Sequence, residues 1–313
     1  MARAAAHVWG SRARVARRCA LPDGARVIGV GGPTLGGSYK TPLTLALARA
    51  LLGRGEPVSV VGHGYGVRLD VARTVRTDDG PWSVGDDAAW LARALHDSGG
   101  AVFVGDRASA IRMAARADSA VLVDGLLQSR PRRLSLSLLA LDAVAPWGSG
   151  ACPPAGDLRA PKDALLEAAD ALVVVHAAAP PTHAPFLETT RPLFHVGGRL
   201  AATLGSDGSP VALESLAAAR VGVVLAIARP SRVLESLDAC GIRPTTTRFF
   251  ADHATPHAYV TPRRSDVDFW LTTPKCATKL EARYESAPLV VLNHELSLPD
   301  DLVALCRAAR GVH

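Results

Sequence analysis

The run Arg26-Val-Ile-Gly-Val30, the loop from Gly31 to Tyr39 and the apolar segment from Thr41 to Leu52 decide the fold class. The first segment is typical of a short buried strand and the last of a helix, with a glycine-rich loop between them. A strand, a loop of small residues and a helix in this order form the first unit of an α/β sheet. The loop runs into the helix through Thr34-Leu-Gly-Gly-Ser-Tyr-Lys-Thr-Pro42.

The same alternation continues along the chain on the C-terminal side of this unit. Helical patterns lie at 86–95 and 108–115, and apolar runs that predict strands lie at 58–61, 101–104, 120–123, 136–141 and 171–175. Continuous apolar strands separated by helices predict a parallel sheet that helices cover on both faces. Ligands bind outside the carboxyl ends of the strands in such sheets, so the residues after each strand are candidates for a site.

A second, smaller α/β series follows. The segment 193–204 and the turn 205–210 predict a hairpin-like connector. Beyond it we expect helices at 231–239 and 300–309 and strands at 221–227, 269–272 and 289–292. The chain therefore divides into a sheet domain over 23–185 and a connector with a smaller C-terminal α/β domain over 186–313.

The loop before the first helix carries the side chains of a phosphate-binding loop. Lys40 suits the β- and γ-phosphates of a nucleotide, and the Thr41 hydroxyl suits Mg²⁺. Small residues before them let backbone N–H groups face phosphate oxygens at a helix N-terminus. Two glycines of the general pattern are replaced by Thr34 and Tyr39, and the Tyr39 ring should crowd the loop or force another backbone path. The motif alone leaves two interpretations, a nucleotide-binding loop in a P-loop NTPase-like fold or a purely structural loop.

Charge is concentrated at the N-terminus. The chain of 313 residues has 35 Lys and Arg against 29 Asp and Glu, a net charge of +6, and 48% hydrophobic residues, which is typical of a globular protein. Residues 1–22 predict a basic amphipathic helix with five arginines, Arg3, Arg12, Arg14, Arg17 and Arg18. This pattern fits either a helix on an anionic membrane surface or a solvated helix packed on the domain.

Several classes of protein are excluded by composition. The five cysteines show no CxxC spacing, which argues against a disulfide scaffold or a zinc site and indicates a reducing, cytoplasmic compartment. No apolar stretch reaches the roughly 18–20 residues that span a bilayer. Basic residues are not interleaved with aromatic ones, so we expect no nucleic-acid partner, and no obligate protein partner is evident. The absence of an NKxD motif argues against a GTPase.

Taken in order, the motifs resemble those of the tetraacyldisaccharide 4'-kinases of lipid A synthesis. Thr34 to Pro42 matches the family loop TxGGxGKTP except at Tyr39. His63-Gly-Tyr-Gly66 resembles the RGYG segment, and Val84-Gly-Asp-Asp87 resembles VGDE. Val104-Gly-Asp-Arg107 resembles the segment that supplies an arginine at the end of the next strand.

The resemblance continues to about residue 300. Asp124 to Ser129 resembles DDGxQH, and Gly150 to Pro161 resembles LLPAGPLREP. Phe250-Ala-Asp-His253 resembles FxDHH, and Thr272-Thr-Pro-Lys275 resembles TTEKD. The sequence departs from these motifs at Val123, Ser129, Pro274 and Cys276, besides Tyr39.

The resemblance implies ATP-dependent phosphorylation of the 4'-hydroxyl of a tetraacylated glucosamine disaccharide 1-phosphate. It implies ATP and Mg²⁺ as cofactors, an acylated disaccharide lipid as substrate, and a peripheral position at the cytoplasmic face of the bacterial inner membrane, in contact with anionic lipid. Lys40, Asp86 as general base and His253 as its assistant would be the catalytic residues. The other implied roles are nucleotide binding by Thr34, Gly36, Gly37, Ser38, Tyr39, Lys40 and Thr41, metal binding by Thr41, Asp87 and Asp124, and substrate binding by Tyr65, Asp86 and Arg107.

Some of the residues in these motifs also have a purely structural interpretation. Asp86 and Asp87 could cap the helix 86–95, and His253 could be a satisfied loop histidine. Lys275 and Lys279 have the i, i+4 spacing of a solvated helix face.

The departures from the family motifs leave a second function class open. A family member with these replacements could bind lipid or nucleotide without efficient phosphoryl transfer. Affinity for Mg-ATP tests the loop: no binding by the wild-type protein, with recovery in Tyr39→Gly, would support a degenerate loop, and tight binding would reject it.

Overall fold

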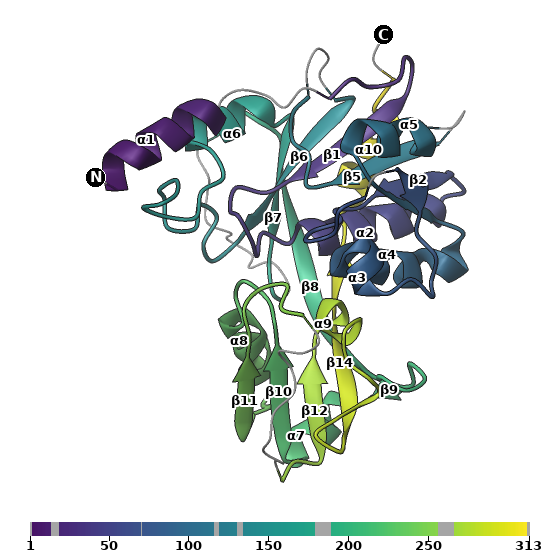
Figure 1. Cartoon of the computed structure of the whole chain (residues 1–313), viewed down its shortest axis with the longest axis vertical. Coiled ribbons are helices and arrows are strands. Elements are labelled where there is room, and N and C mark those ends of the chain that lie inside the picture. The colour runs from purple at the N-terminus through teal and green to yellow at the C-terminus, as the bar shows by residue number, and fades with distance from the viewer. Residues whose placement is uncertain are drawn as a thin grey trace.

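The computed structural model describes residues 2–13, 19–69, 71–115, 119–129, 134–178, 189–255 and 266–311. Within these residues a single 14-stranded sheet runs through both halves of the molecule (Figure 1). Its strand order is β11-β10-β12-β14-β8-β7-β6-β1-β5-β2-β4-β3, with β13 beside β14 and β9 beside β8. We call the part around β1 the first half and the part around β10 the second half.

The first half is a parallel sheet with helices on both faces, as expected for a P-loop NTPase-like fold. Its strands are β1 (Arg26–Gly31), β2 (Val58–Val61), β3 (Arg73–Thr74), β4 (Ala101–Val104), β5 (Ala120–Asp124), β6 (Leu136–Asp142) and β7 (Ala171–Val175). All pair in parallel except β3, which is antiparallel to β4 at the edge. Its helices are α2 (Lys40–Leu52), α3 (Pro81–Val84), α4 (Asp86–Leu95), α5 (Arg107–Ala114), α6 (Lys162–Ala168) and the short 3₁₀ helix η1 (His96–Ser98).

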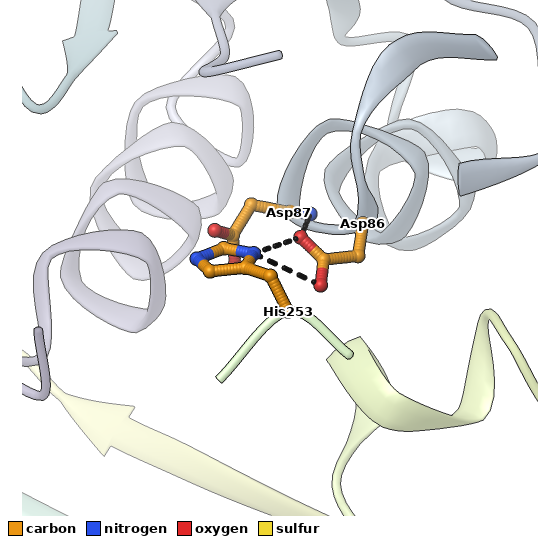
Figure 2. A group of neighbouring side chains, drawn as sticks. All are labelled: Asp86, Asp87 and His253. Atoms are coloured by element: carbon orange, nitrogen blue, oxygen red, sulfur yellow. Dashed lines mark hydrogen bonds and ion pairs between the residues drawn. The ribbon is translucent and has the colours of Figure 1, made fainter. Parts of the chain in front are cut away.

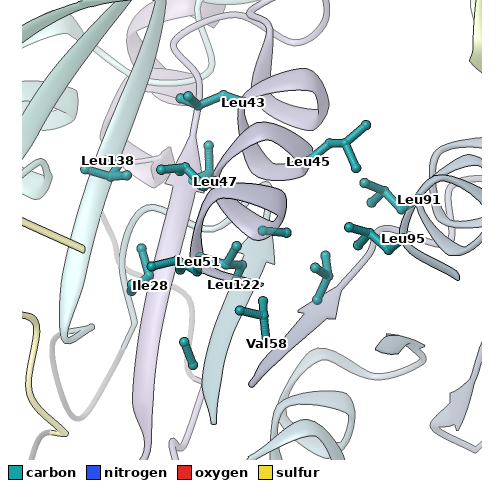
Figure 3. Close-up of a cluster of buried hydrophobic side chains, with 14 of the residues drawn as sticks. Ile28, Leu43, Leu45, Leu47, Leu51, Val58, Leu91, Leu95, Leu122 and Leu138 are labelled. Atoms are coloured by element: carbon teal, nitrogen blue, oxygen red, sulfur yellow. The ribbon is translucent and has the colours of Figure 1, made fainter. Parts of the chain in front are cut away.

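The helix α2 is anchored by a stripe of leucines. Leu43, Leu47 and Leu51 recur every four residues, so they share one face of the helix, and all three are fully buried. Figure 3 shows this face directed towards the sheet, where Ile28 and Leu122 belong to the same core. The packing fixes the N-terminus of α2, and therefore Lys40, at the carboxyl end of β1.

The second half is built on β10 (Val221–Leu225), which pairs in parallel with β11 (Thr246–Phe249) and β12 (Phe269–Thr272). Three short helices belong to it, α7 (Leu213–Ala218), α8 (Ser231–Ala239) and α9 (Pro274–Ala277). The remaining strands are β8 (Leu193–Leu204), β9 (Pro210–Val211), β13 (Arg283–Tyr284) and β14 (Ala287–Ser297).

Two long strands join the halves. β8 pairs with β7 over 193–196 and then antiparallel with β14 over 197–204, so the connection is a two-stranded ribbon rather than a loop. β9 folds back on β8 through the predicted 205–210 turn. The ribbon is visible in Figure 1 as the link between the upper and lower parts of the molecule.

The last helix corrects the predicted division of the chain. The helix α10 (Asp300–Ala308) was expected in the smaller domain, but Leu302, Val303 and Cys306 are buried in the core of the first half, where α10 contacts α2. The reason is that β14 carries the chain back across the molecule. The apolar stripe of α10 predicts a buried face but not which core buries it.

The N-terminal helix is shorter than the predicted span 1–22. The helix α1 covers Ala2–Ala13, residues 19–22 are not helical, and Cys19 is buried in a core beside β1. Gly10 is buried close to the Pro161 ring, and the Trp9 indole donates a hydrogen bond to the Arg159 carbonyl at 3.1 Å. Arg14, Arg17 and Arg18, which belong to the predicted helix, lie outside the described residues.

Among the described residues, no helix has the length and apolar character needed to cross a bilayer.

Candidate active site

The predicted site residues gather in a cleft between the two halves. The cleft has a volume of about 1140 Å³, lies at the carboxyl ends of β1 and β5, and is also lined by residues of the second half. Its lining includes Gly36, Gly37, Ser38, Tyr39, Lys40, Thr41, Tyr65, Asp87, Arg107, Asp124 and His253. The two remaining candidates, Thr34 and Asp86, are buried behind this lining. The structure therefore brings together residues that are up to 219 positions apart in sequence, Thr34 and His253.

The loop before α2 is held by its own hydrogen bonds. The Thr34 hydroxyl donates to the Gly36 carbonyl at 2.7 Å, and its oxygen lies 2.6 Å from the Ser38 hydroxyl. The Leu35 N–H donates to the Asp157 carbonyl at 2.9 Å. Thr34, which replaces a glycine of the general pattern, therefore stabilises the loop as a hydrogen-bonding residue.

Tyr39 stands where the general motif has a glycine, and its backbone takes the left-handed conformation that a glycine would favour. Its φ of 57° and ψ of 17° are strained for a residue with a Cβ. The centroid of its ring lies 5.4 Å from that of His294 in β14, and the Arg232 guanidinium lies 5.2 Å from it. The expected crowding is therefore resolved by the ring packing against groups of the second half and of the connecting ribbon.

Lys40, Thr41 and Asp124 lie together in the cleft. The Thr41 hydroxyl donates to Asp124 Oδ2 at 2.6 Å. Burial lowers the pKa of Lys40, while the Asp124 carboxylate acts in the opposite direction. Asp124 Oδ1 is buried and has no hydrogen-bond partner among the described residues.

This donor set fits a magnesium ion. Mg²⁺ prefers carboxylate and hydroxyl oxygens, and a bound ion would satisfy the unpartnered oxygen of Asp124, which is otherwise costly to bury. Thr41 and Asp124 are therefore the residues that could hold it. Asp87, the third predicted ligand, lies instead 3.6 Å from Lys275 Nζ.

Asp86 and His253 meet across the boundary between the halves. His253 Nδ1 lies 2.9 and 3.1 Å from the two carboxylate oxygens of Asp86, as Figure 2 shows. Its other nitrogen, Nε2, lies 3.1 Å from Lys275 Nζ. A protonated lysine can only donate, so Nε2 accepts and the proton of a neutral ring resides on Nδ1, where it donates to Asp86. The Tyr65 ring stacks on His253 with centroids 4.0 Å apart.

Two lysines of the second half neutralise the paired carboxylates at the start of α4. Lys279 Nζ lies 2.6 Å from Asp86 Oδ2, and Lys275 Nζ lies 3.6 Å from Asp87 Oδ2 and 3.1 Å from Asp252 Oδ1. Their side chains are only 5% and 15% exposed, so the predicted solvated face is wrong. Lys275 lies in α9 and Lys279 two residues beyond its end, and both side chains are turned to Asp86 in the first half.

The lysines and His253 also influence the pKa values of the Asp86 and Asp87 carboxyl groups. Burial would raise the pKa of Asp86, but the hydrogen bond with His253 and the charge of Lys275 hold that pKa below its usual range. Burial raises the pKa of Asp87 despite the same lysine. Asp86, Asp87 and His253 have ligand atoms close enough to share a cation, yet Lys275 and Lys279 already supply positive charge there. An ionised Asp86 in a salt-bridge network is the better description.

Sequence reasoning missed two arginines of the second half that pack on the loop before α2. Arg232 donates a hydrogen bond to the Gly37 carbonyl and pairs with Asp142, and Arg229 pairs with Asp157 at 2.8 Å. Asp142 was detectable as a polar residue directly after a strand. The arginines carried no comparable signal, because their contacts depend on how the halves meet.

Comparison with known proteins decides the family. The sequence profile of the tetraacyldisaccharide-1-P 4'-kinases matches residues 3–309. The chain belongs to this family of kinases. The tetraacyldisaccharide 4'-kinase of Acidithiobacillus ferrooxidans is 37% identical over 251 residues, which cover 78% of this chain and 72% of that protein. The enzyme of the same name from Methylobacterium nodulans is 33% identical over 311 residues, covering 94% of this chain and 87% of that protein.

The fold agrees with the family. LpxK from Aquifex aeolicus, solved in complex with ATP, superposes with a TM-score of 0.73 at 22% identity, covering 97% of this chain and 96% of that chain. The resemblance to tetraacyldisaccharide 4'-kinases and the P-loop NTPase-like fold predicted from the sequence are thus both confirmed.

Proposed function

We propose that this protein transfers the γ-phosphoryl group of ATP to the 4'-hydroxyl of a tetraacylated glucosamine disaccharide 1-phosphate. The observation that carries the proposal is the hydrogen bond between Asp86 and His253, which faces the Lys40 loop across one cleft. Phosphoryl transfer requires positioning, charge neutralisation and an acceptor for the hydroxyl proton, and this cleft offers a group for each. Family membership supports the same reaction.

The nucleotide side of the reaction belongs to the loop and the first turn of α2. Backbone N–H groups at the N-terminus of α2 and the Lys40 ammonium would bind the β- and γ-phosphates. Thr41 and Asp124 would hold Mg²⁺, which supplies further neutralisation of phosphate charge when bound. The low exposure of these groups strengthens their electrostatic interaction with a phosphate.

The acceptor side belongs to Asp86 and His253, which we assign together as the general base. Asp86 is ionised and buried, and it holds the proton of the neutral imidazole on Nδ1. The substrate hydroxyl proton passes to this pair, and the negative charge of Asp86 stabilises the cationic ring that results. Lys275 Nζ lies beside Nε2 in this structure. When substrate binds, the 4'-hydroxyl would take the position of Nζ beside Nε2, and Lys275 would turn towards the phosphoryl group.

The lipid would lie along the apolar end of the cleft. Trp9, Leu127, Ala164 and Leu165 line this end beside α1 and α6. Such side chains suit acyl chains. Arg107, whose guanidinium donates to the Asp124 carbonyl at 2.9 Å, and Tyr65 would contact the polar disaccharide and its phosphate. We place the enzyme at the cytoplasmic face of the bacterial inner membrane as a peripheral protein.

The test is transfer of labelled phosphate from Mg-ATP to the disaccharide lipid by the purified protein. Asp86→Asn should lower turnover at least about 100-fold, as expected when a general base is lost. The matched control is Asp97→Asn, which changes an exposed carboxylate just beyond the same helix and should retain full activity. Near-normal turnover by Asp86→Asn would refute the assignment of the base, and no transfer by the wild-type protein would refute the function.

A further inference from the structure

The second half of the molecule holds the phosphate loop through Arg232. This side chain projects from the first turn of α8, donates a hydrogen bond to the Gly37 carbonyl and pairs with the buried Asp142 at the end of β6. Its guanidinium also lies 5.2 Å from the centroid of the Tyr39 ring. A single group of the second half therefore contacts the loop at two positions and the strand edge beside it.

Arg229 reinforces the same contact from the segment before α8. Its guanidinium lies 2.8 Å from Asp157 Oδ2 and 3.7 Å from Asp142 Oδ2. A Cβ placed on Gly37 would lie 3.1 Å from the Arg229 side chain, so the arginine packs directly on the loop. Asp157 also holds the loop by accepting a hydrogen bond from the Leu35 N–H through its carbonyl.

The loop of this chain needs such support because of Tyr39. A tyrosine in the left-handed region is less stable there than the glycine that phosphate-binding loops use. Contacts of the ring with the Arg232 guanidinium and with His294 compensate for that strain. Arg232 is also mostly buried, so its fork of donors is fixed by Gly37 and Asp142 rather than by solvent.

We propose that Arg232 is a positioning residue that holds the phosphate loop in its ATP-binding conformation from the second half of the molecule. ATP affinity then depends on the contact between the halves, although Arg232 lies in neither the loop nor α2. The inference rests on the proposed use of ATP at this loop, but it does not depend on the identity of the lipid.

Calorimetric titration of the full-length protein with Mg-ATP, in the absence of lipid, tests the proposal. Arg232→Gln should weaken binding at least about tenfold, because a hydrogen bond from a charged donor is worth about that factor or more. Arg243→Gln is the matched control in the same half, since the Arg243 side chain is 87% exposed and pairs only with Asp238 at the surface among the described residues. Unchanged affinity in Arg232→Gln would overturn the proposal.

Two further variants separate positioning from simple charge pairing. Arg232→Lys keeps a charge for Asp142 but lacks the planar fork that reaches Gly37 and covers Tyr39, so it should bind ATP almost as weakly as Arg232→Gln. Full affinity in Arg232→Lys, together with weak binding in Asp142→Asn, would show that only the ion pair matters and would overturn the proposal.

A double-mutant cycle tests the contact with Tyr39. The effect of Arg232→Gln should be about threefold smaller in a Tyr39→Leu background, which is the coupling expected of a cation–π contact. Additive effects would contradict a role through Tyr39. Thermal unfolding identifies any variant that does not fold, and Arg232→Lys carries the test if Arg232→Gln fails. A protein with this ATP dependence but no lipid phosphorylation would refute the proposed substrate and leave the inference standing.

Discussion

Tyr39 has two opposing effects at the scale of one residue. Its backbone is in the left-handed region, which destabilises the folded state, and its ring contacts Arg232 and His294, which stabilises it. Comparing substitutions at this position separates the two effects. An alanine and a glycine both remove the ring, and they differ only in the Cβ that the positive φ disfavours.

Tyr39→Gly should therefore be more stable than Tyr39→Ala by about 1 kcal/mol, the usual penalty of a Cβ in this region. Urea unfolding at equilibrium measures the difference. Leu35, an exposed loop residue that has no positive φ, is the control. There the alanine variant should equal or exceed the glycine variant, because glycine only adds freedom to the unfolded chain. The same order of stabilities at both positions would contradict backbone strain at Tyr39.

At the scale of elements, the sequence predicts the strands and helices that have a strong apolar pattern. It does not predict the elements whose position depends on contacts with distant parts of the chain. The buried strands of the first half and the helices α2, α4 and α8 lie close to their expected positions, because apolar runs and amphipathic periods are local signals. The strand β11 was missed because Thr246–Phe249 has no continuous apolar run, and α9 was missed because four residues are too few to show a helical period. Lys40 and Asp124 were found from their place after strands, whereas the burial of Lys279 depends on α9 facing the first half.

The placement of α10 gives a prediction about an element. Leu302 is fully buried against the core of α2, while Leu305 on the same helix is only partly buried. Leu302→Ala should lower the free energy of unfolding by about 2–5 kcal/mol, and Leu305→Ala should lower it by less, because a smaller cavity remains. Urea unfolding followed by far-UV circular dichroism measures both. Equal small losses would argue that α10 is not part of this core.

At the scale of the whole molecule, charge and apolar surface are distributed unevenly. The candidate active-site cleft extends to α1 and α6, since Trp9 and Ala164 belong to its lining. On α1, Val8 is 54% and Trp9 43% exposed. Basic residues are concentrated in the same N-terminal stretch, while the chain as a whole has a net charge of +6. An apolar face beside basic residues suits the surface of an anionic bilayer.

This arrangement predicts that the protein binds an anionic membrane through α1. Vesicles of phosphatidylcholine with phosphatidylglycerol should sediment the wild-type protein, and replacing both Val8 and Trp9 by serine should weaken partitioning about tenfold or more, because burial of each side chain contributes about 1.5–3 kcal/mol. Val71→Ser is the control, since Val71 is 74% exposed but belongs to the segment between β2 and β3. Raising the salt concentration should also release the wild-type protein, because ions screen attraction between arginines and anionic lipid. Equal partitioning of wild type and the double variant would place the membrane contact on another surface, and insensitivity to salt would remove the electrostatic part of the argument.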